Sequence, residues 1–87
     1  MTAISVIVPV FNQAGRLGDC LDALLQQDVP AGSFEVIVVD NGSGDESMAV
    51  ARQRPAVRLL AEPRRSAYAA RNRGIRAARG SLIAFTD

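Results

Sequence analysis

Four short apolar runs, separated by segments of helical character, constrain the fold of this chain more than any other feature. They are Ile4–Val10, Phe34–Asp40, Val57–Leu60 and Leu82–Phe85. Each run is too short for an ordinary helix, and the second is almost continuously apolar, as strands covered on both faces are. The alternation therefore predicts an α/β fold with a parallel sheet and helical, right-handed crossovers.

Three helices are predicted between these strands. Leucines recur at helical spacing over about residues 15–27 and form one apolar stripe. A second helix is expected over residues 45–54, before Pro55, and a third over residues 67–79, before Gly80. The order β-α-β-α-β-α-β predicts a Rossmann-like sheet with strand order 3-2-1-4, in which the loops after strands 1, 2 and 4 share one crevice.

The length and the C-terminal residue suggest only part of a domain. The 87 residues fall short of the roughly 100–150 usual for a domain, and the last strand ends on Asp87 at the edge where α/β sheets bind ligands. We expect residues 1–87 to be the N-terminal half of a larger domain. The uncovered edge beyond the last strand predicts that this chain alone is marginally stable or prone to aggregation.

Composition excludes several classes of protein. A chain with 48% hydrophobic and 22% charged residues is globular, and its net charge of +1 predicts no nucleic-acid partner. The absence of histidine and the single Cys20 exclude Cys/His metal sites and internal disulfides, and Cys20 is expected to pack in the core. No apolar run approaches the roughly 18 residues of a membrane span and no signal peptide is evident, so we expect a cytoplasmic protein.

Four side chains near strand ends are candidates for chemistry, each with a structural alternative. Phe11 could stack on a base or pack against the helix that follows it. The Asp40 carboxylate could accept a hydrogen bond from an imide or a ribose, or close a local turn. Arg71 could hold a carbonyl or phosphate oxygen, or remain solvated. Asp87 could ligate a divalent cation or begin a turn, but one carboxylate makes no metal site.

Four motifs follow one another in this chain: Ile4–Asn12, Val38–Asp45, Ala70–Ile75 and Leu82–Asp87. In this order and spacing they resemble family 2 glycosyltransferases of the GT-A fold. The resemblance implies transfer of a sugar from a nucleotide-diphosphate-sugar donor to an acceptor hydroxyl, with inversion and with a divalent metal (Mg²⁺ or Mn²⁺). It also implies that this segment is the nucleotide-sugar-binding half, truncated at the DxD motif and inactive alone.

The resemblance assigns nucleotide-sugar binding to six residues: Pro9, Val10, Phe11, Asp40, Arg71 and Asp87. By position, Pro9 and Val10 offer backbone contacts to the base. Phe11 stands where the family has the aromatic residue, most often tyrosine, that stacks on the base. Asp40 matches the acid that reads a uracil-type imide, Arg71 the arginine that holds the nucleotide, and Asp87 the first acid of DxD, beside ribose and metal. The catalytic base would follow residue 87. Gln13 and Asn41 depart from the acids common in the family.

Two other classes of protein stay open at this point. A non-catalytic α/β binding or regulatory module of the receiver type would need clustered acids at strands 1 and 3, where this chain has Pro9-Val10 and Ala61-Glu62. An anion-binding domain could use the arginines, because all ten basic residues are arginine and six lie within residues 64–79. For a glycosyltransferase, the acceptor is unknown, and peripheral association with the inner face of a membrane would depend on segments outside this chain.

Overall fold

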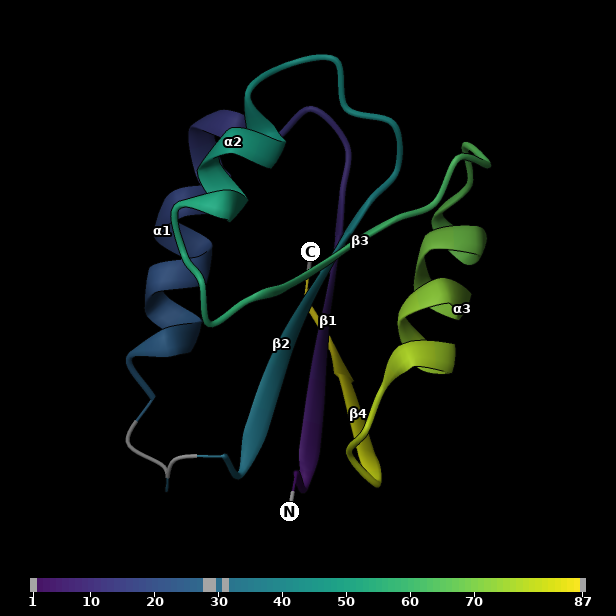
Figure 1. Cartoon of the computed structure of the whole chain (residues 1–87). Helices are drawn as coiled ribbons and strands as arrows, with labels where there is room; N and C mark the ends of the chain where they lie inside the picture. Colours follow the sequence, from purple (N-terminus) through teal and green to yellow (C-terminus); the bar gives the residue numbers. More distant parts are fainter. Residues whose placement is uncertain (1, 28–29, 31, 87) are drawn as a thin grey trace.

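Parallel pairing of the four apolar runs produces a single sheet in the computed structural model, which describes residues 2–27, 30 and 32–86 (Figure 1). The strands are β1 (Ile4–Val10), β2 (Phe34–Asp40), β3 (Arg58–Ala61) and β4 (Leu82–Phe85), in the order β3-β2-β1-β4. Strand β1 pairs in parallel with β2 and β4, and β2 pairs in parallel with β3. The predicted fold class and strand order are confirmed.

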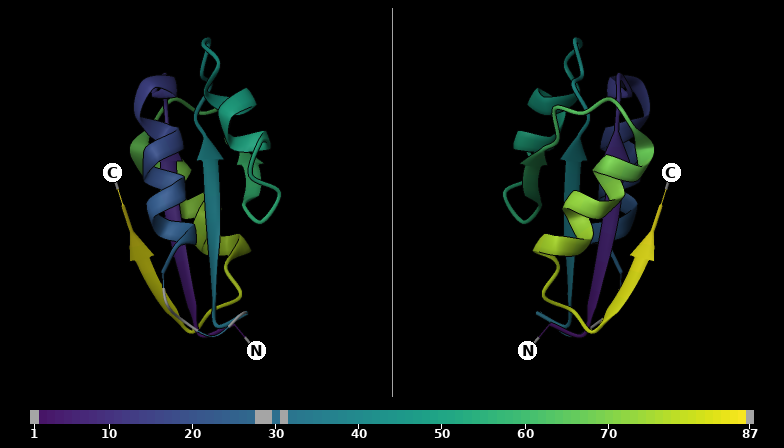
Figure 2. Two further views of the ribbon diagram at one scale, coloured as in Figure 1. Left: turned by 90° about the vertical axis from the view of Figure 1, so that its left-hand side faces the viewer. Right: turned by 90° about the vertical axis from the view of Figure 1, so that its right-hand side faces the viewer.

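The helices cover both faces of the sheet, as the apolar character of its central strands requires. Helices α1 (Ala14–Leu25) and α2 (Ser47–Arg52) lie on one face, and α3 (Ala67–Ala77) lies on the other (Figure 2). Alternate residues of β1 and β2 point to opposite faces and so divide the core in two. The core beneath α1 and α2 contains Val8, Val10, Leu17, Leu21, Val36, Val38 and Ala51. The core beneath α3 contains Ile7, Ile37, Val39 and Ala70.

The helix boundaries differ from the predicted ones by a turn or less. Helix α2 begins at Ser47 rather than at residue 45, because the Asp45 carboxylate accepts a hydrogen bond from the Ser47 N–H at 2.9 Å and precedes the helix. Helix α3 ends at Ala77 because Ala78 is extended, with φ −65° and ψ 139°. Strand β3 begins one residue later than predicted. These differences leave the order of the elements unchanged.

Close contact between α3 and the sheet depends on a glycine. A Cβ atom added to Gly74 would lie 2.6 Å from Cγ2 of Ile7, closer than carbon atoms approach without a shift of the structure. The helix therefore rests directly on β1 at this point. Because α3 begins with Ala67 at the carboxyl edge of the sheet, this packing also fixes the position of its first turn.

A partly buried carboxylate, Glu35, organises the amino end of the sheet. Glu35 accepts hydrogen bonds from the Ser5 hydroxyl at 2.6 Å, the Arg79 N–H at 2.7 Å and the Arg58 guanidinium at 2.8 Å. Burial alone raises the pKa of Glu35, but these hydrogen bonds, led by the one from Ser5, outweigh burial and hold its pKa below the usual range. Glu35 thereby connects β2 to β1, to β3 and to the chain that follows α3.

Strand β4 is the edge of the sheet beside β1, and its side chains are poorly covered. Leu82 and Phe85 are 62% and 47% exposed. Exposed apolar side chains on an edge strand favour association with another chain segment. No helix in the described part of the chain is both long and apolar enough to cross a membrane.

Candidate functional site

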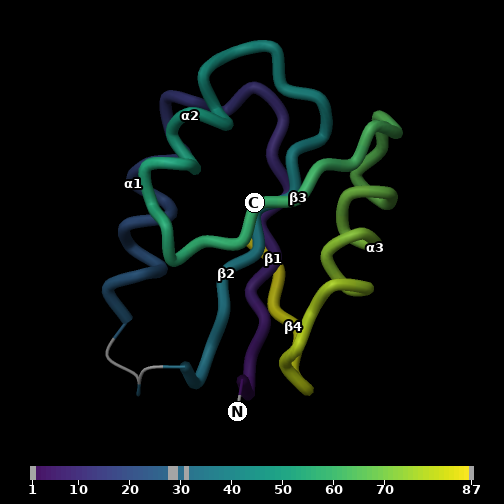
Figure 3. The backbone as a smooth tube through the Cα atoms, in the orientation of Figure 1, coloured from purple at the N-terminus to yellow at the C-terminus, as the bar shows by residue number. Residues whose placement is uncertain are grey.

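Loops from three parts of the chain lie at the carboxyl end of the sheet, as the backbone trace shows (Figure 3). They follow β1, β2 and β3, and the last of them leads into α3. The first two interlock at Asn12, which adopts a left-handed conformation with φ 51°. Its N–H donates to the Ser43 hydroxyl at 3.0 Å, and its side-chain oxygen accepts from the Gly44 N–H at 2.8 Å. The loop after β1 is thus held against the loop after β2.

The same contact region satisfies the first amides of α1. The Gln13 N–H donates to the Ser47 hydroxyl at 2.9 Å, and the Ala14 N–H donates to the Asp45 carboxylate at 3.2 Å. Hydrogen bonds from the side chain and backbone of Ser47, and then from Ala14, hold the pKa of Asp45 below its usual range. Asp45 and Ser47 therefore supply acceptors for the first N–H groups of α1 and α2 and fix where the chain leaves β1.

Asn41 connects the end of β2 to the segment between β3 and α3. The residue is buried, with an exposed fraction of only 7%. The amide nitrogen donates to the carbonyl oxygens of Glu62 at 3.0 Å and Arg64 at 2.5 Å, and the amide oxygen accepts from the Ser66 N–H at 3.1 Å. A carboxylate could make only the last of these bonds. This explains why the chain has asparagine where the resemblance suggests an acid, a role that the sequence analysis did not assign to Asn41.

Beside these loops lies a hollow of about 220 Å³. Its lining residues are Pro9, Val10, Phe11, Gln13, Asn41, Ala67 and Arg71. Four of the six residues predicted to bind a nucleotide sugar are among them: Pro9, Val10, Phe11 and Arg71. The structure therefore brings together side chains that are about 60 positions apart in the sequence, although their binding role stays a prediction.

The ring of Phe11 lies at the rim of this hollow. The residue is 36% exposed, and the guanidinium carbon of Arg65 lies 3.4 Å from the ring centroid, within range of a cation–π interaction. Through Arg65 the ring contacts the segment that leads into α3, a contact that neither stacking on a base nor packing against its own helix had predicted. Arg71 is half-buried, and its guanidinium carbon lies 6.0 Å from the Phe85 ring centroid.

The two predicted acids differ in how far the structure describes them. Asp40 pairs with Val10 across the β1–β2 register, so its carboxylate lies at the same edge of the sheet as the hollow without lining it. Its Oδ1 accepts the Ser43 N–H at 3.0 Å, so Asp40 does close a local turn, although the donor is Ser43 rather than the expected Asn41-Gly42 backbone. Asp87 lies outside the described residues. Within residues 2–27, 30 and 32–86, no group of three Asp, Glu, Cys or His side chains could hold a metal ion.

The start of α3 adds positive potential to the hollow. Ala67, the first residue of α3, lines it, so the positive end of the helix dipole faces the cavity. Ser66 caps this helix by accepting the Ala69 N–H at 3.3 Å. Three arginines of residues 64–79 make different contacts: Arg65 covers Phe11, Arg71 lines the hollow, and Arg76 lies 4.0 Å from Glu62.

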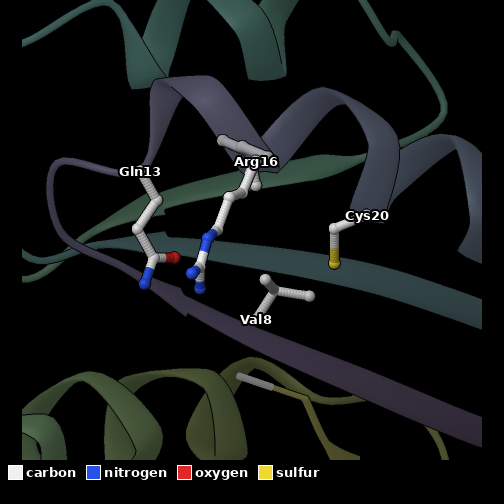
Figure 4. Close-up of a pocket in the computed structure, with 5 residues that line it drawn as sticks. Val8, Gln13, Arg16 and Cys20 are labelled. Carbon is white, nitrogen blue, oxygen red and sulfur yellow. The ribbon is translucent and has the colours of Figure 1, made fainter.

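A second, smaller hollow of about 30 Å³ lies between α1 and β1 (Figure 4). It is lined by Val8, Gln13, Arg16, Leu17 and Cys20. This volume suits one or two water molecules rather than a substrate. The Cys20 side chain is half-buried and points toward Val8 of β1, as expected for a packing residue.

Sequence comparisons place the chain among sugar-transferring enzymes. The family model described as glycosyl transferase family 2 matches residues 5–87. The glycosyltransferase AglE of Haloferax volcanii is 40% identical over 89 residues, which cover 97% of this chain and 29% of AglE. The uncharacterized glycosyltransferase YibD of Escherichia coli is 38% identical over 88 residues, covering 97% of this chain and 25% of YibD. This chain thus spans less than a third of the length of these relatives.

Solved structures show the same architecture. The mannosyltransferase PcManGT from Pyrobaculum calidifontis, in complex with GDP-Man and Mn²⁺, superposes with a TM-score of 0.85 and 34% identity over 92% of this chain and 25% of its own. Residues 1–349 of TarS from S. aureus, in complex with UDP-GlcNAc, superpose with a TM-score of 0.82 and 28% identity over 99% of this chain and 26% of that one. By its family match and its GT-A fold, the chain belongs to glycosyl transferase family 2.

Proposed function

We propose that this chain binds the nucleoside diphosphate part of a nucleotide-activated sugar at the carboxyl edge of its sheet. The observation that carries the proposal is the hollow that Pro9 and Val10 of β1 line together with Phe11 and Arg71, at the same end of the sheet as Asp40. The complete enzyme would transfer the sugar to an acceptor hydroxyl with inversion. GDP-Man in PcManGT and UDP-GlcNAc in TarS support this class of donor.

The size and lining of the hollow suit a nucleoside. Complete small-molecule sites typically occupy about 300–1,000 Å³, so a hollow of about 220 Å³ fits only part of a nucleotide sugar. Pro9, Val10 and Phe11 supply apolar surface and an aromatic ring, on which a base gains about 1–3 kcal/mol by stacking. We place the base on Phe11, with the sugar extending beyond the described residues.

In this arrangement Asp40 reads the edge of the base. A carboxylate accepts hydrogen bonds and has about four lone-pair positions, so its bond to the Ser43 N–H leaves capacity for a ligand. Uracil and guanine both present a ring N–H at the edge that would face Asp40. Because Ser43 fixes one carboxylate oxygen, the other is held in a defined direction.

Arg71 and the start of α3 supply the positive charge that a diphosphate requires. The guanidinium can bind a carbonyl or phosphate oxygen through two parallel hydrogen bonds. Ala67 places the N-terminal end of α3 at the same hollow, and a helix N-terminus favours anions. Both groups would stabilise the negative charge that develops on the nucleotide as it leaves the sugar.

Transfer itself would require residues beyond this segment. In an inverting reaction a carboxylate base removes the acceptor proton, the acceptor oxygen attacks the anomeric carbon, and the bond to the diphosphate breaks. The described residues do not form a metal site by themselves, so we propose that Asp87 and residues outside this chain hold the divalent cation, which would supply positive charge to the diphosphate. Mn²⁺ in PcManGT supports such a cation.

Calorimetric titration of the complete enzyme with UDP and with GDP tests the proposal. Asp40→Asn keeps an oxygen for the Ser43 N–H but replaces the other acceptor with a donor, so the ring N–H of the base loses its partner. We expect nucleotide affinity to fall about 5- to 150-fold, from a loss of about 1–3 kcal/mol. The exposed Asp19→Asn on α1 is the matched control. Equal affinities for the two variants would refute the role of Asp40.

A further inference from the structure

We infer that Arg65 competes with the nucleobase for the ring of Phe11 and so sets the affinity of the enzyme for its nucleotide. This inference rests on the proposed function, in which a base stacks on that ring. The guanidinium carbon of Arg65 lies 3.4 Å from the ring centroid, which is stacking distance. A base and a guanidinium cannot occupy the same ring face together.

The Arg65 side chain spans the loops that follow the two strands that the base is proposed to contact. Its Cδ atom lies 3.5 Å from the position that a Cβ on Gly42 would take, just after β2, and its guanidinium lies over Phe11, just after β1. The side chain therefore crosses the space between the Asp40 turn and the aromatic ring. Arg65 does not line the hollow itself, so this side chain lies beside it, in the path of a base that stacks on Phe11 and reaches toward Asp40.

The backbone on either side of Arg65 is anchored, so release of the ring requires rotation of a side chain rather than movement of a loop. The Arg64 N–H donates to the Glu62 carboxylate at 3.0 Å, and the Ser66 N–H donates to the Asn41 side chain at 3.1 Å. Both acceptor residues are buried, at 8% and 7% exposure. Arg65 itself is exposed and has room to turn toward solvent.

The relative strengths of the two contacts make the exchange feasible. A base stacked on an aromatic ring is held more strongly than a guanidinium in an exposed cation–π contact. The base therefore displaces Arg65, but its measured affinity is reduced by the strength of the contact that it replaces. From the usual strength of such contacts, the reduction is about two- to five-fold.

Uridine and guanosine are suitable probes because they carry no phosphate, and any electrostatic contribution of Arg65 to diphosphate binding is removed. In NMR titrations of the complete enzyme, we expect Arg65→Ala to bind one or both nucleosides about two- to five-fold more tightly than the unsubstituted enzyme. Arg64→Ala is the matched control, since it removes the same charge from the neighbouring exposed residue and keeps the backbone hydrogen bonds. It should leave nucleoside affinity unchanged.

A second pair of variants isolates the ring. In a Phe11→Leu background the Arg65→Ala substitution should have no effect, because neither the cation nor the base has an aromatic face to occupy. Weaker binding by Arg65→Ala, affinity equal to that of Arg64→Ala, or an effect that persists in the Phe11→Leu background would each overturn the competition. If the unsubstituted enzyme binds UDP and GDP but Phe11→Leu does not weaken nucleoside binding, the proposed base position fails instead.

Discussion

The side chain of Asn41 should be essential for the loop that leads into α3, and Asn41→Asp tests this with a change of one atom. The amide makes three hydrogen bonds, two as donor to the carbonyls of Glu62 and Arg64 and one as acceptor from Ser66. Aspartate keeps the last bond and loses the other two. It also places carboxylate oxygen against two carbonyl oxygens in a site that is 7% exposed.

We expect this change to destabilise the protein by about 3–4 kcal/mol. Two lost hydrogen bonds account for about 2 kcal/mol, and the acceptors left unpaired in a buried site account for the remainder. In urea denaturation of the complete enzyme, followed by circular dichroism, the midpoint for the unit containing this chain should fall by at least about 1 M. The exposed Asn72→Asp in α3 is the matched control. Equal midpoints for the two variants would show that the Asn41 amide does not hold the loop.

Three further outcomes are expected. Gly74→Ala should lower the unfolding free energy by about 1–2 kcal/mol, because its methyl group would lie 2.6 Å from a β1 side chain. Gly15→Ala in α1 has nothing within 4 Å of the new methyl group and should raise the unfolding free energy by about 0.5–1 kcal/mol. Equal effects of the two substitutions in denaturation would contradict the close packing of α3. The lowered pKa of Glu35 gives stability that is present above its ordinary pKa of 4.5 and is lost as the pH falls through its lower folded-state pKa. Glu35→Gln should therefore make the unfolding free energy fall less steeply at acidic pH. An unchanged fall at acidic pH would refute this role of Glu35. The isolated 87-residue chain should transfer no sugar and should aggregate less when Leu82 and Phe85 are both replaced by serine; measurable turnover, or unchanged light scattering, would contradict these expectations.

The sequence was sufficient to predict the elements and their order because those depend on local patterns. Short, continuous β-branched runs are typical of strands buried on both faces, and leucines at helical spacing form one face of a helix. The predicted strand order 3-2-1-4 is the one observed. The short helix α2 was predicted too long, since its start depends on the contact of Asp45 with Ser47 and with the first turn of α1.

The candidate site could be predicted only in part. Positions at the ends of strands follow from topology, and so Phe11 and Arg71 were expected at one crevice, where they do line one hollow. The contacts of Asn41 and Arg65 could not be predicted, because each joins residues at least 21 positions apart through side-chain geometry. One signal was available for Asn41: an amide stood where the resembling family commonly has an acid, which suggests a need for donors.

The proposal that Phe11, Asp40 and Arg71 hold one nucleotide is tested most directly by a crystal structure of the complete enzyme with UDP or GDP bound. We expect the base to lie on the Phe11 ring in place of the Arg65 guanidinium, with its ring N–H directed at the Asp40 carboxylate and Arg71 bound to a carbonyl or phosphate oxygen. A nucleotide bound away from the carboxyl edge of β1 and β2, or a Phe11 ring that still carries Arg65 in the complex, would contradict it.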